Sequence, residues 1–169
     1  MKILDATCGA KNMWFQPNHP FVTFLDKRDG KYMNHLFDRT TNINPDVVGD
    51  WTKRLPFDDE YFDMVLFDPP HIIRDKVNKC NMDVLYGYLQ KDTWRMDLQK
   101  GIQELFRVLK NEGVFVFKWG QSHVLIDEIL RLFPYKPLFG NKNKDISKND
   151  KDTIWLVFLK YRSEQTLNI

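Results

Sequence analysis

The sequence has few of the features that mark several large classes of protein. Cys8 and Cys80 are its only cysteines, too few for a disulfide framework and without the paired spacing of a zinc site. No apolar run approaches the roughly 18 residues of a membrane-spanning helix. Asp5 interrupts the first apolar residues, so no signal peptide is expected. These absences predict a cytoplasmic protein with no metal and no membrane contact.

The excess of one charge sign over the other is small as well. The formal net charge is +2 and the sequence pI is about 8.4, a weaker positive balance than nucleic-acid-binding proteins usually carry. Hydrophobic residues, in contrast, make up 43% of the chain and aromatic residues 14%, which is enough for a packed core. We therefore expect one domain over residues 1–169, with a composition that permits a nucleic-acid partner without requiring one.

Short apolar runs alternate with segments of helical periodicity along the chain. Six strands are predicted, at residues 1–5, 22–26, 47–48, 62–68, 114–119 and 153–160. Amphipathic helices are predicted at 98–110 and 122–133, the second with Ser122 as its cap. This alternation indicates a mostly parallel, doubly wound α/β sheet. Residues 72–94 form a long connection expected to be functional or mobile, and 140–152 a solvated hairpin tip.

The ends of the first three strands offer candidate contacts for a nucleoside cofactor, because ligands of open α/β sheets bind at the carboxyl ends of the strands. The first strand ends in Asp5 and Ala6, and the turn that follows contains Cys8 and Gly9. The small Gly9 would let the backbone approach a ligand closely. An ordinary turn between a strand and a helix would look the same.

The next two strand ends carry acids in a matching order. Asp26, followed by Lys27, lies about 20 residues after the first turn, where an acid can accept both hydroxyls of a ribose. Asp50 can accept from an adenine amino group, and Trp51 can cover the adenine face. The alternatives are a surface Asp that caps the next element and a Trp that packs in the core.

The most distinctive segment is Asp68-Pro69-Pro70-His71, directly after the most apolar strand. Two prolines end a central strand and stiffen the turn, so the carboxylate beside them is held rigidly. Asp68 and a neighbouring backbone carbonyl can each accept one N–H of a planar amino group. The alternative is that the two prolines only end the strand. For His71, the sequence leaves open whether it stacks on the target ring, forms a hydrogen bond with it or bonds only to nearby residues.

These residues resemble the class I methyltransferases that depend on S-adenosylmethionine (SAM), in particular the amino-methyltransferases with an Asp/Asn/Ser-Pro-Pro-aromatic motif. The chain is similar to a group of small methyltransferases, often of phage or prophage origin, that are described as DNA methylases. The similar segments are residues 3–15, 24–28, 55–71, 104–119, 137–141 and 155–160.

The resemblance implies a Rossmann-like fold with a mostly parallel seven-stranded sheet and an antiparallel strand near the C-terminus. It also implies SAM as the cofactor, with its methionine part along Asp5, Cys8 and Gly9, its ribose at Asp26 and its adenine at Asp50. The Asp-Pro-Pro-His segment would line the acceptor pocket.

The chain departs from that family in three ways. The usual glycine-rich first turn is reduced to a single glycine, His71 replaces the aromatic residue of the motif, and no segment is large enough for a DNA target-recognition domain. Contacts with DNA would fall to the segments 72–94 and 140–152, or to a partner protein or second copy of the chain.

We therefore expect an N-methyltransferase that acts on a planar amino group, with adenine N6 in nucleic acid, and DNA above RNA, as the acceptor. A base in a duplex would have to flip out. The candidate phosphate contacts are Lys76, Lys79, Lys91 and Arg95, and the candidate stacking residues are Tyr86, Trp94 and Trp119. The alternatives are a small-molecule or protein-amide methyltransferase and a SAM-binding partner subunit without activity.

Overall fold

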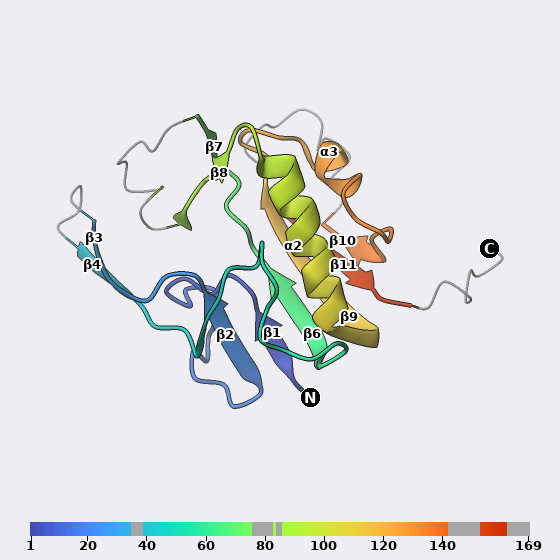
Figure 1. Ribbon diagram of the computed structural model, residues 1–169, viewed down its shortest axis with the longest axis horizontal. Coiled ribbons are helices and arrows are strands. Elements are labelled where there is room, and N and C mark those ends of the chain that lie inside the picture. The colour runs from blue at the N-terminus through green and yellow to red at the C-terminus, as the bar shows by residue number, and fades with distance from the viewer. Residues whose placement is uncertain (35–38, 76–82, 84–85, 142–152, 162–169) are drawn as a thin grey trace.

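A seven-stranded sheet forms the centre of the fold in the computed structural model, which describes residues 1–34, 39–75, 83, 86–141 and 153–161. In chain order its strands are β1 (Ile3–Asp5), β2 (Val22–Asp26), β5 (Val47–Val48), β6 (Phe62–Phe67), β9 (Leu109–Gly120), β10 (Phe139–Gly140) and β11 (Thr153–Leu159). Their spatial order is β10-β11-β9-β6-β1-β2-β5 (Figure 1).

The strand directions match the expected α/β architecture. The neighbouring strands β5, β2, β1, β6 and β9 pair in parallel. In contrast, β11 runs antiparallel to β9, and β10 runs antiparallel to β11. The chain leaves β1 toward β2 and later returns to β6 on its other side, so the order reverses between β1 and β6. The carboxyl ends of these strands therefore meet at a topological switch point, where ligands of open sheets bind.

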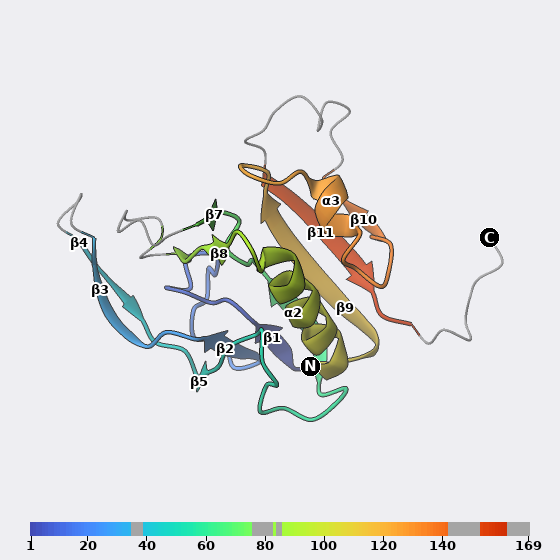
Figure 2. The same cartoon turned by 45° about the horizontal axis from the view of Figure 1, so that its top comes forward.

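Helices α2 (Trp94–Val108) and α3 (Ile126–Leu130) lie on the same face of the sheet (Figure 2). The Phe106 ring of α2 stacks on Phe115 of β9 with 4.6 Å between centroids, and Phe133, beyond α3, stacks on Phe158 of β11 at 4.4 Å. Burial of these rings against the sheet stabilises the fold.

The opposite face is covered differently at the β1–β2 end. Cys8, Val22 and Phe24 form a second buried cluster, with Trp14 packed against it. In the described chain, the connection from β1 to β2 contains turns and no helix. The connection from β2 to β5 is a hairpin of β3 (Gly30–Asn34) and β4 (Arg39–Ile43) that projects away from the sheet (Figure 1).

The predicted bounds of both helices are wrong. The first helix begins at Trp94 and ends at Val108, and the chain enters β9 directly at Leu109. The helix expected at 122–133 shrinks to α3, so Ser122 is not its cap.

Side-chain hydrogen bonds explain the short α3. The Trp119 indole donates to the Val124 carbonyl at 2.8 Å, and the Ile126 amide donates to Gln121 Oε1 at 2.9 Å. These bonds hold residues 121–125 in a turn. The Leu132 and Phe133 amides then bond three residues back, as in a tightening helix end.

The long connection after β6 contains two short strands in its described part. They are β7 (Ile73–Arg74) and β8 (Leu89–Gln90), which pair in parallel. Residues 76–82 and 84–85 lie outside the described chain, as do residues 142–152 of the expected hairpin tip. Within the described residues, no helix is both long and apolar enough to cross a membrane.

Candidate functional site

The strand ends bring the predicted cofactor and acceptor residues to one edge of the sheet. β1 lies between β2 and β6, with Asp5 level with Phe24 and Leu66. The carboxyl groups of Asp26 and Asp68 are near enough to Asp5 to raise its pKa. The first turn and the Asp-Pro-Pro-His segment therefore lie close together at this edge.

Asp5 organises this edge from inside the protein. Its side chain is fully buried and accepts the Trp14 indole N–H at 2.7 Å and the Thr7 amide at 3.1 Å. Burial raises its pKa to about 6. Ala6 is also fully buried, and its amide donates to the Leu66 carbonyl at 2.9 Å. Both residues position the turn, and neither side chain reaches the surface.

Gly9, in the turn after β1, contacts Asp26 at the end of β2. Gly9 has a φ of +50°, a left-handed conformation that side chains disfavour, and its amide donates to Asp26 Oδ2 at 3.0 Å. Arg28 donates its amide and Nε to Oδ1 and its Nη2 to Oδ2.

These four hydrogen bonds saturate the acceptor capacity of the Asp26 carboxylate. A ribose hydroxyl can bind there only after the Arg28 side chain moves. Lys27, beside it, is exposed.

Asp50 follows β5, and among the described residues its Oδ2 has no hydrogen-bond partner. Thr52 donates both its amide and its hydroxyl to Oδ1, at 2.9 and 2.8 Å. Trp51 is only 7% exposed, and its ring meets Phe67 edge-on at 5.1 Å. The Trp51 ring thus packs in the core, which is the alternative to covering an adenine face.

Cys8 lies at the same edge of the sheet, and its thiol is a poor nucleophile. It is 5% exposed, and its amide donates to the Leu25 carbonyl at 2.9 Å. Burial and the nearby carboxylates raise the pKa of its thiol to about 12. The thiolate that a nucleophile requires is therefore essentially absent at neutral pH.

The backbone and side chain of Asp68 are each fixed by a residue that the sequence interpretation missed. The Asp68 amide donates to Thr7 Oγ1 at 2.9 Å, and the Lys118 ammonium donates to Asp68 Oδ2 at 2.6 Å. Both partners come from neighbouring strand ends, and only knowledge of the strand register could have placed them. Among the described residues Asp68 Oδ1 has no hydrogen-bond partner, and the side chain is 20% exposed.

The rest of the motif is packed around this carboxylate. Pro69 is buried and Pro70 half-buried. A methyl group on Gly120 would lie 2.8 Å from the His71 ring, so His71 packs closely against the end of β9. Burial lowers the pKa of His71 and so favours its neutral form. A neutral imidazole here can both donate and accept.

The structure contradicts two of the three predicted stacking residues. Trp94 is 5% exposed and Trp119 fully buried, so neither can stack on a base, whereas Tyr86 is 52% exposed. Two of the predicted phosphate contacts are engaged in ion pairs, Lys91 with Asp75 at 3.3 Å and Arg95 with Glu128. Lys76 and Lys79 lie outside the described residues.

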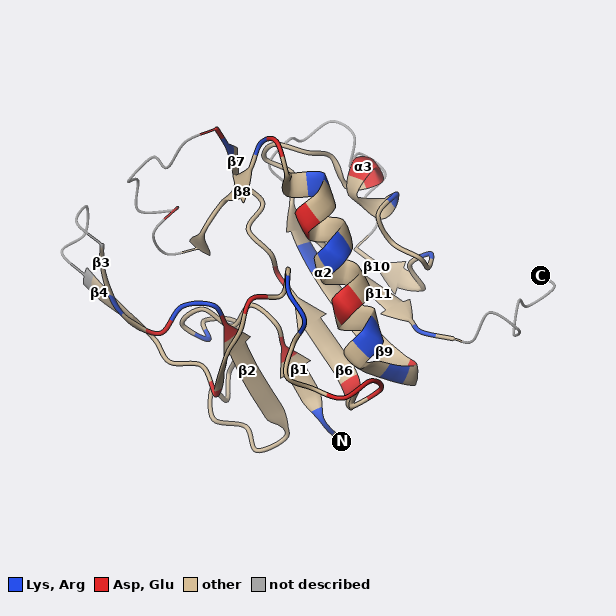
Figure 3. Ribbon diagram, viewed as in Figure 1, with Lys and Arg blue, Asp and Glu red and all other residues tan. Residues whose placement is uncertain are grey.

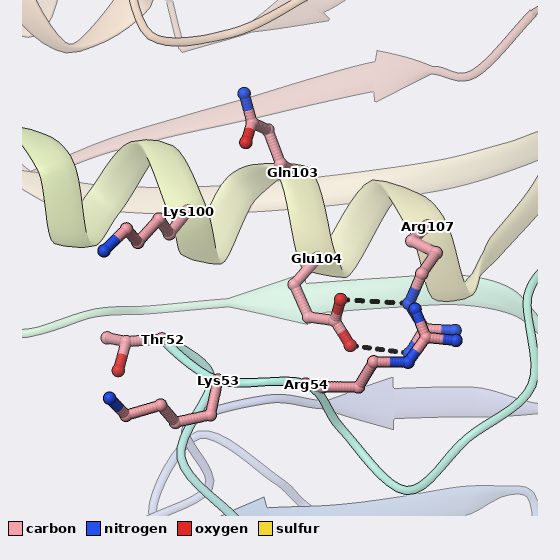
Figure 4. Close-up of a pocket in the computed structure, with 7 residues that line it drawn as sticks. All are labelled: Thr52, Lys53, Arg54, Lys100, Gln103, Glu104 and Arg107. Carbon is pink, nitrogen blue, oxygen red and sulfur yellow. Dashed lines mark hydrogen bonds and ion pairs between the residues drawn. The ribbon is translucent and has the colours of Figure 1, made fainter.

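A basic pocket of about 340 Å³ lies between α2 and the segment that follows Trp51 (Figure 4). Its floor is fixed, because Glu104 accepts the Leu55 amide at 2.7 Å and binds Arg107 through two oxygens, at 2.6 and 2.9 Å. Lys53 and Lys100 have no ion-pair partner in the described chain. Their ammonium groups extend in the same direction along the pocket.

Basic and acidic residues alternate along α2 (Figure 3).

Comparison with known proteins gives a clear answer only for the fold. No family model and no curated protein matches the chain. A SAM-dependent methyltransferase of Methanosarcina mazei is similar, with a TM-score of 0.60 at 13% identity over 95% of this chain and 92% of its own.

Two further solved structures are N-methyltransferases. That of Burkholderia thailandensis, with bound 1,6-didemethyltoxoflavin and S-adenosylhomocysteine, has a TM-score of 0.55 at 15% identity, over 95% of this chain and 71% of its own. NodS of Bradyrhizobium japonicum has a TM-score of 0.53 at 11% identity, over 95% and 86%. The chain therefore has the Rossmann-like class I methyltransferase fold.

Proposed function

We propose that this chain is a SAM-dependent N-methyltransferase whose acceptor is a planar amino group, with adenine N6 in nucleic acid, and DNA above RNA, as the substrate class. The observation that carries the proposal is Asp68. Its carboxylate stands at the end of β6 with Oδ2 held by Lys118 and Oδ1 open. Beside it lies the turn where proteins of this fold hold their cofactor.

The first turn and the Asp50 end fit such a cofactor. A methyl group added at Gly9 would find only Arg28 Nη2, at 4.0 Å, so the backbone there is open to close approach. Asp50 retains Oδ2 for an amino group. Asp26 fits a ribose once Arg28 releases it. SAM, when bound, supplies an activated methyl group.

The acceptor end depends on this chain's own residues. Asp68 Oδ1 accepts one N–H of the amine and thereby orients the nitrogen lone pair. The Pro69-Pro70 turn restricts the backbone beside the carboxylate, and only 20% of the Asp68 side chain is exposed. Alignment and fixed charges of this kind are the main sources of acceleration in a direct transfer. The raised pKa of Cys8 argues against a covalent route through that thiol.

The basic pocket beside α2 is a second feature, separate from the Asp68 turn, that suits an anionic partner. Lys53 and Lys100 offer two unpaired ammonium groups beside the segment that follows Asp50, which suits the phosphates of a nucleic acid. A small-molecule or protein-amide acceptor is the alternative, and a SAM-binding subunit without activity is a third. The open Oδ1 of Asp68 favours an active enzyme over the third.

The test combines SAM calorimetry with transfer of a labelled methyl group to DNA, RNA and small amines. Asp68→Ala should keep the wild-type affinity for SAM and lose about a hundredfold or more in rate, because losing one fixed hydrogen-bonding group costs roughly 2.7–4 kcal/mol of barrier. Asp63→Ala is the matched control, since Asp63 lies on the same strand and pairs with Lys110 at 2.7 Å.

Full activity of Asp68→Ala on the true acceptor would disprove the acceptor role of Asp68. Transfer to small amines but to neither nucleic acid would select the first alternative. SAM binding without transfer to any acceptor would leave the inactive subunit as the better description.

A further inference from the structure

Lys118 is a charged residue near the carboxyl end of β9, in the part of the strand where alternate side chains are buried. Along β9, Phe115, Phe117 and Trp119 are fully buried on the helix side of the sheet. Lys118 alternates with them and so lies on the opposite face. Phe117 is level with Phe67 of β6, which places Lys118 and Asp68 side by side, each one position further along its strand.

The ammonium group of Lys118 is held from three sides. It lies 2.6 Å from Asp68 Oδ2, 3.8 Å from the Met13 sulfur and 5.7 Å from the centre of the Trp155 ring. Trp155 belongs to β11 and is level with Lys118 across the sheet. The Lys118 side chain is only 26% exposed, so this is a fixed pair and not a solvated surface contact.

We propose that Lys118 is a positioning residue of the acceptor site, which occupies Oδ2 of Asp68 and keeps that carboxylate ionised, so that Oδ1 alone receives the acceptor N–H. This inference rests on the proposed methyl transfer. It assigns the positioning of the Asp68 carboxylate to a residue of β9, outside the Asp-Pro-Pro-His segment.

The charge balance around Asp68 gives the physical reason. Burial raises the pKa of Asp68, whereas the hydrogen bond and charge of Lys118 act to lower it. His71, on the same turn, also acts to lower it, and Asp5 on β1 faces Asp68 as a second acid. Without Lys118, the carboxyl would hold its proton to higher pH, and a protonated oxygen donates where an acceptor is required.

The expected sign follows from that balance. Loss of Lys118 raises the pKa of Asp68, and the ionised form is the active one. The acidic limb of the pH–rate profile should therefore move to higher pH, with activity partly recovered in alkaline buffer. A residue that only braced the fold would lower the rate equally at every pH.

The chain provides a matched control at the other end of the same two strands. Lys110 of β9 pairs with Asp63 of β6 at 2.7 Å, far from the switch-point edge. Lys110→Met removes the same type of cross-strand ion pair. It should leave the pH–rate profile unchanged.

The experiment measures kcat against pH for the wild type, Lys118→Met, Lys118→Arg and Lys110→Met, with SAM affinity by calorimetry. Lys118→Met should lose tenfold or more at pH 7, shift its acidic limb upward by at least one pH unit, and bind SAM as the wild type does. Lys118→Arg should keep the limb near its wild-type position. Lys118→Gln serves if the Met variant does not fold.

A ¹³C NMR titration of the Asp68 carboxyl separates this inference from the proposed function. A wild type that transfers no methyl group to any acceptor refutes the proposed function, and the titration then decides whether Lys118 controls Asp68. An unshifted Asp68 pKa in the Lys118→Met or Lys118→Gln variant overturns the inference. So does an active variant whose acidic limb stays at the wild-type pH.

Discussion

At the scale of single residues, Asp5 shows how a buried acid ties the stability of this fold to pH. In the folded chain its pKa is about 6, against an ordinary value of 3.8. Between these values the folded state binds the proton that the unfolded chain has already lost. The free energy of unfolding therefore falls as the pH rises through this window, and the loss is complete above pH 6.

Asp5→Asn removes this titration. Between pH 4 and pH 7, we expect the variant to gain stability relative to the wild type by roughly 2–3 kcal/mol, which is about two pKa units. Urea unfolding at several pH values measures the difference. In the variant, one amide oxygen replaces the two carboxylate oxygens that accept from Trp14 and Thr7, which changes the free energy of unfolding by the same amount at every pH. Only the pH dependence of the difference between variant and wild type therefore tests the idea. A pH-independent difference would contradict it.

The residue scale also shows what the sequence could reveal about the site. Asp68 and its two prolines stand out because a rigid turn after an apolar strand is visible in one short segment. Lys118 and Thr7 could not be found in this way, since their relation to Asp68 exists only through the strand register. Likewise, nothing in the sequence showed that the Arg28 side chain would donate hydrogen bonds to both carboxylate oxygens of Asp26.

At the scale of elements, the α2 contact with Trp51 explains a glycine in the middle of a helix. A methyl group on Gly101 would lie 2.2 Å from Trp51 Cε3, so the helix rests directly on the indole ring. Glycine normally costs a helix about 1 kcal/mol relative to alanine. The close packing is the reason that the fold tolerates it.

Gly101→Ala should therefore destabilise the protein despite the better helix propensity of alanine. Overpacking of this kind costs about 1–3 kcal/mol, and the buried Trp51 has little room to move. Lys100→Ala, at the exposed neighbouring position, should change the free energy of unfolding by no more than about 0.5 kcal/mol. Denaturant unfolding compares the two, and a stabilised Gly101→Ala would show that the ring can shift freely.

Element prediction succeeded where one apolar pattern decided the outcome. Strands β2 and β5 have the predicted bounds, and β1, β6 and β11 differ from them by one or two residues. The α3 region failed because Val124, Ile126 and Ile129 have helical spacing while side-chain bonds from Trp119 and Gln121 hold a turn. The β3–β4 hairpin carries too little apolar alternation to be recognised.

At the scale of the whole molecule, the charge distribution limits how the chain could hold a nucleic acid. With a formal net charge of only +2, the long-range field is weak, and binding must depend on local cations. Arg95 and Lys91 are already paired. The unpaired lysines of the basic pocket are the strongest described candidates.

The salt dependence of binding can separate a local pocket from the overall charge. Each phosphate contact lowers log K by about 0.9 per tenfold increase in salt, so Lys53→Ala/Lys100→Ala should reduce the slope by about 2. Lys31→Ala/Lys136→Ala is the matched control, because both residues are exposed and both double variants reduce the net charge to zero. If the pocket holds phosphates, only the first variant changes the slope for an adenine-containing oligonucleotide. Equal slopes in both variants would mean that the pocket makes no specific contact with phosphate.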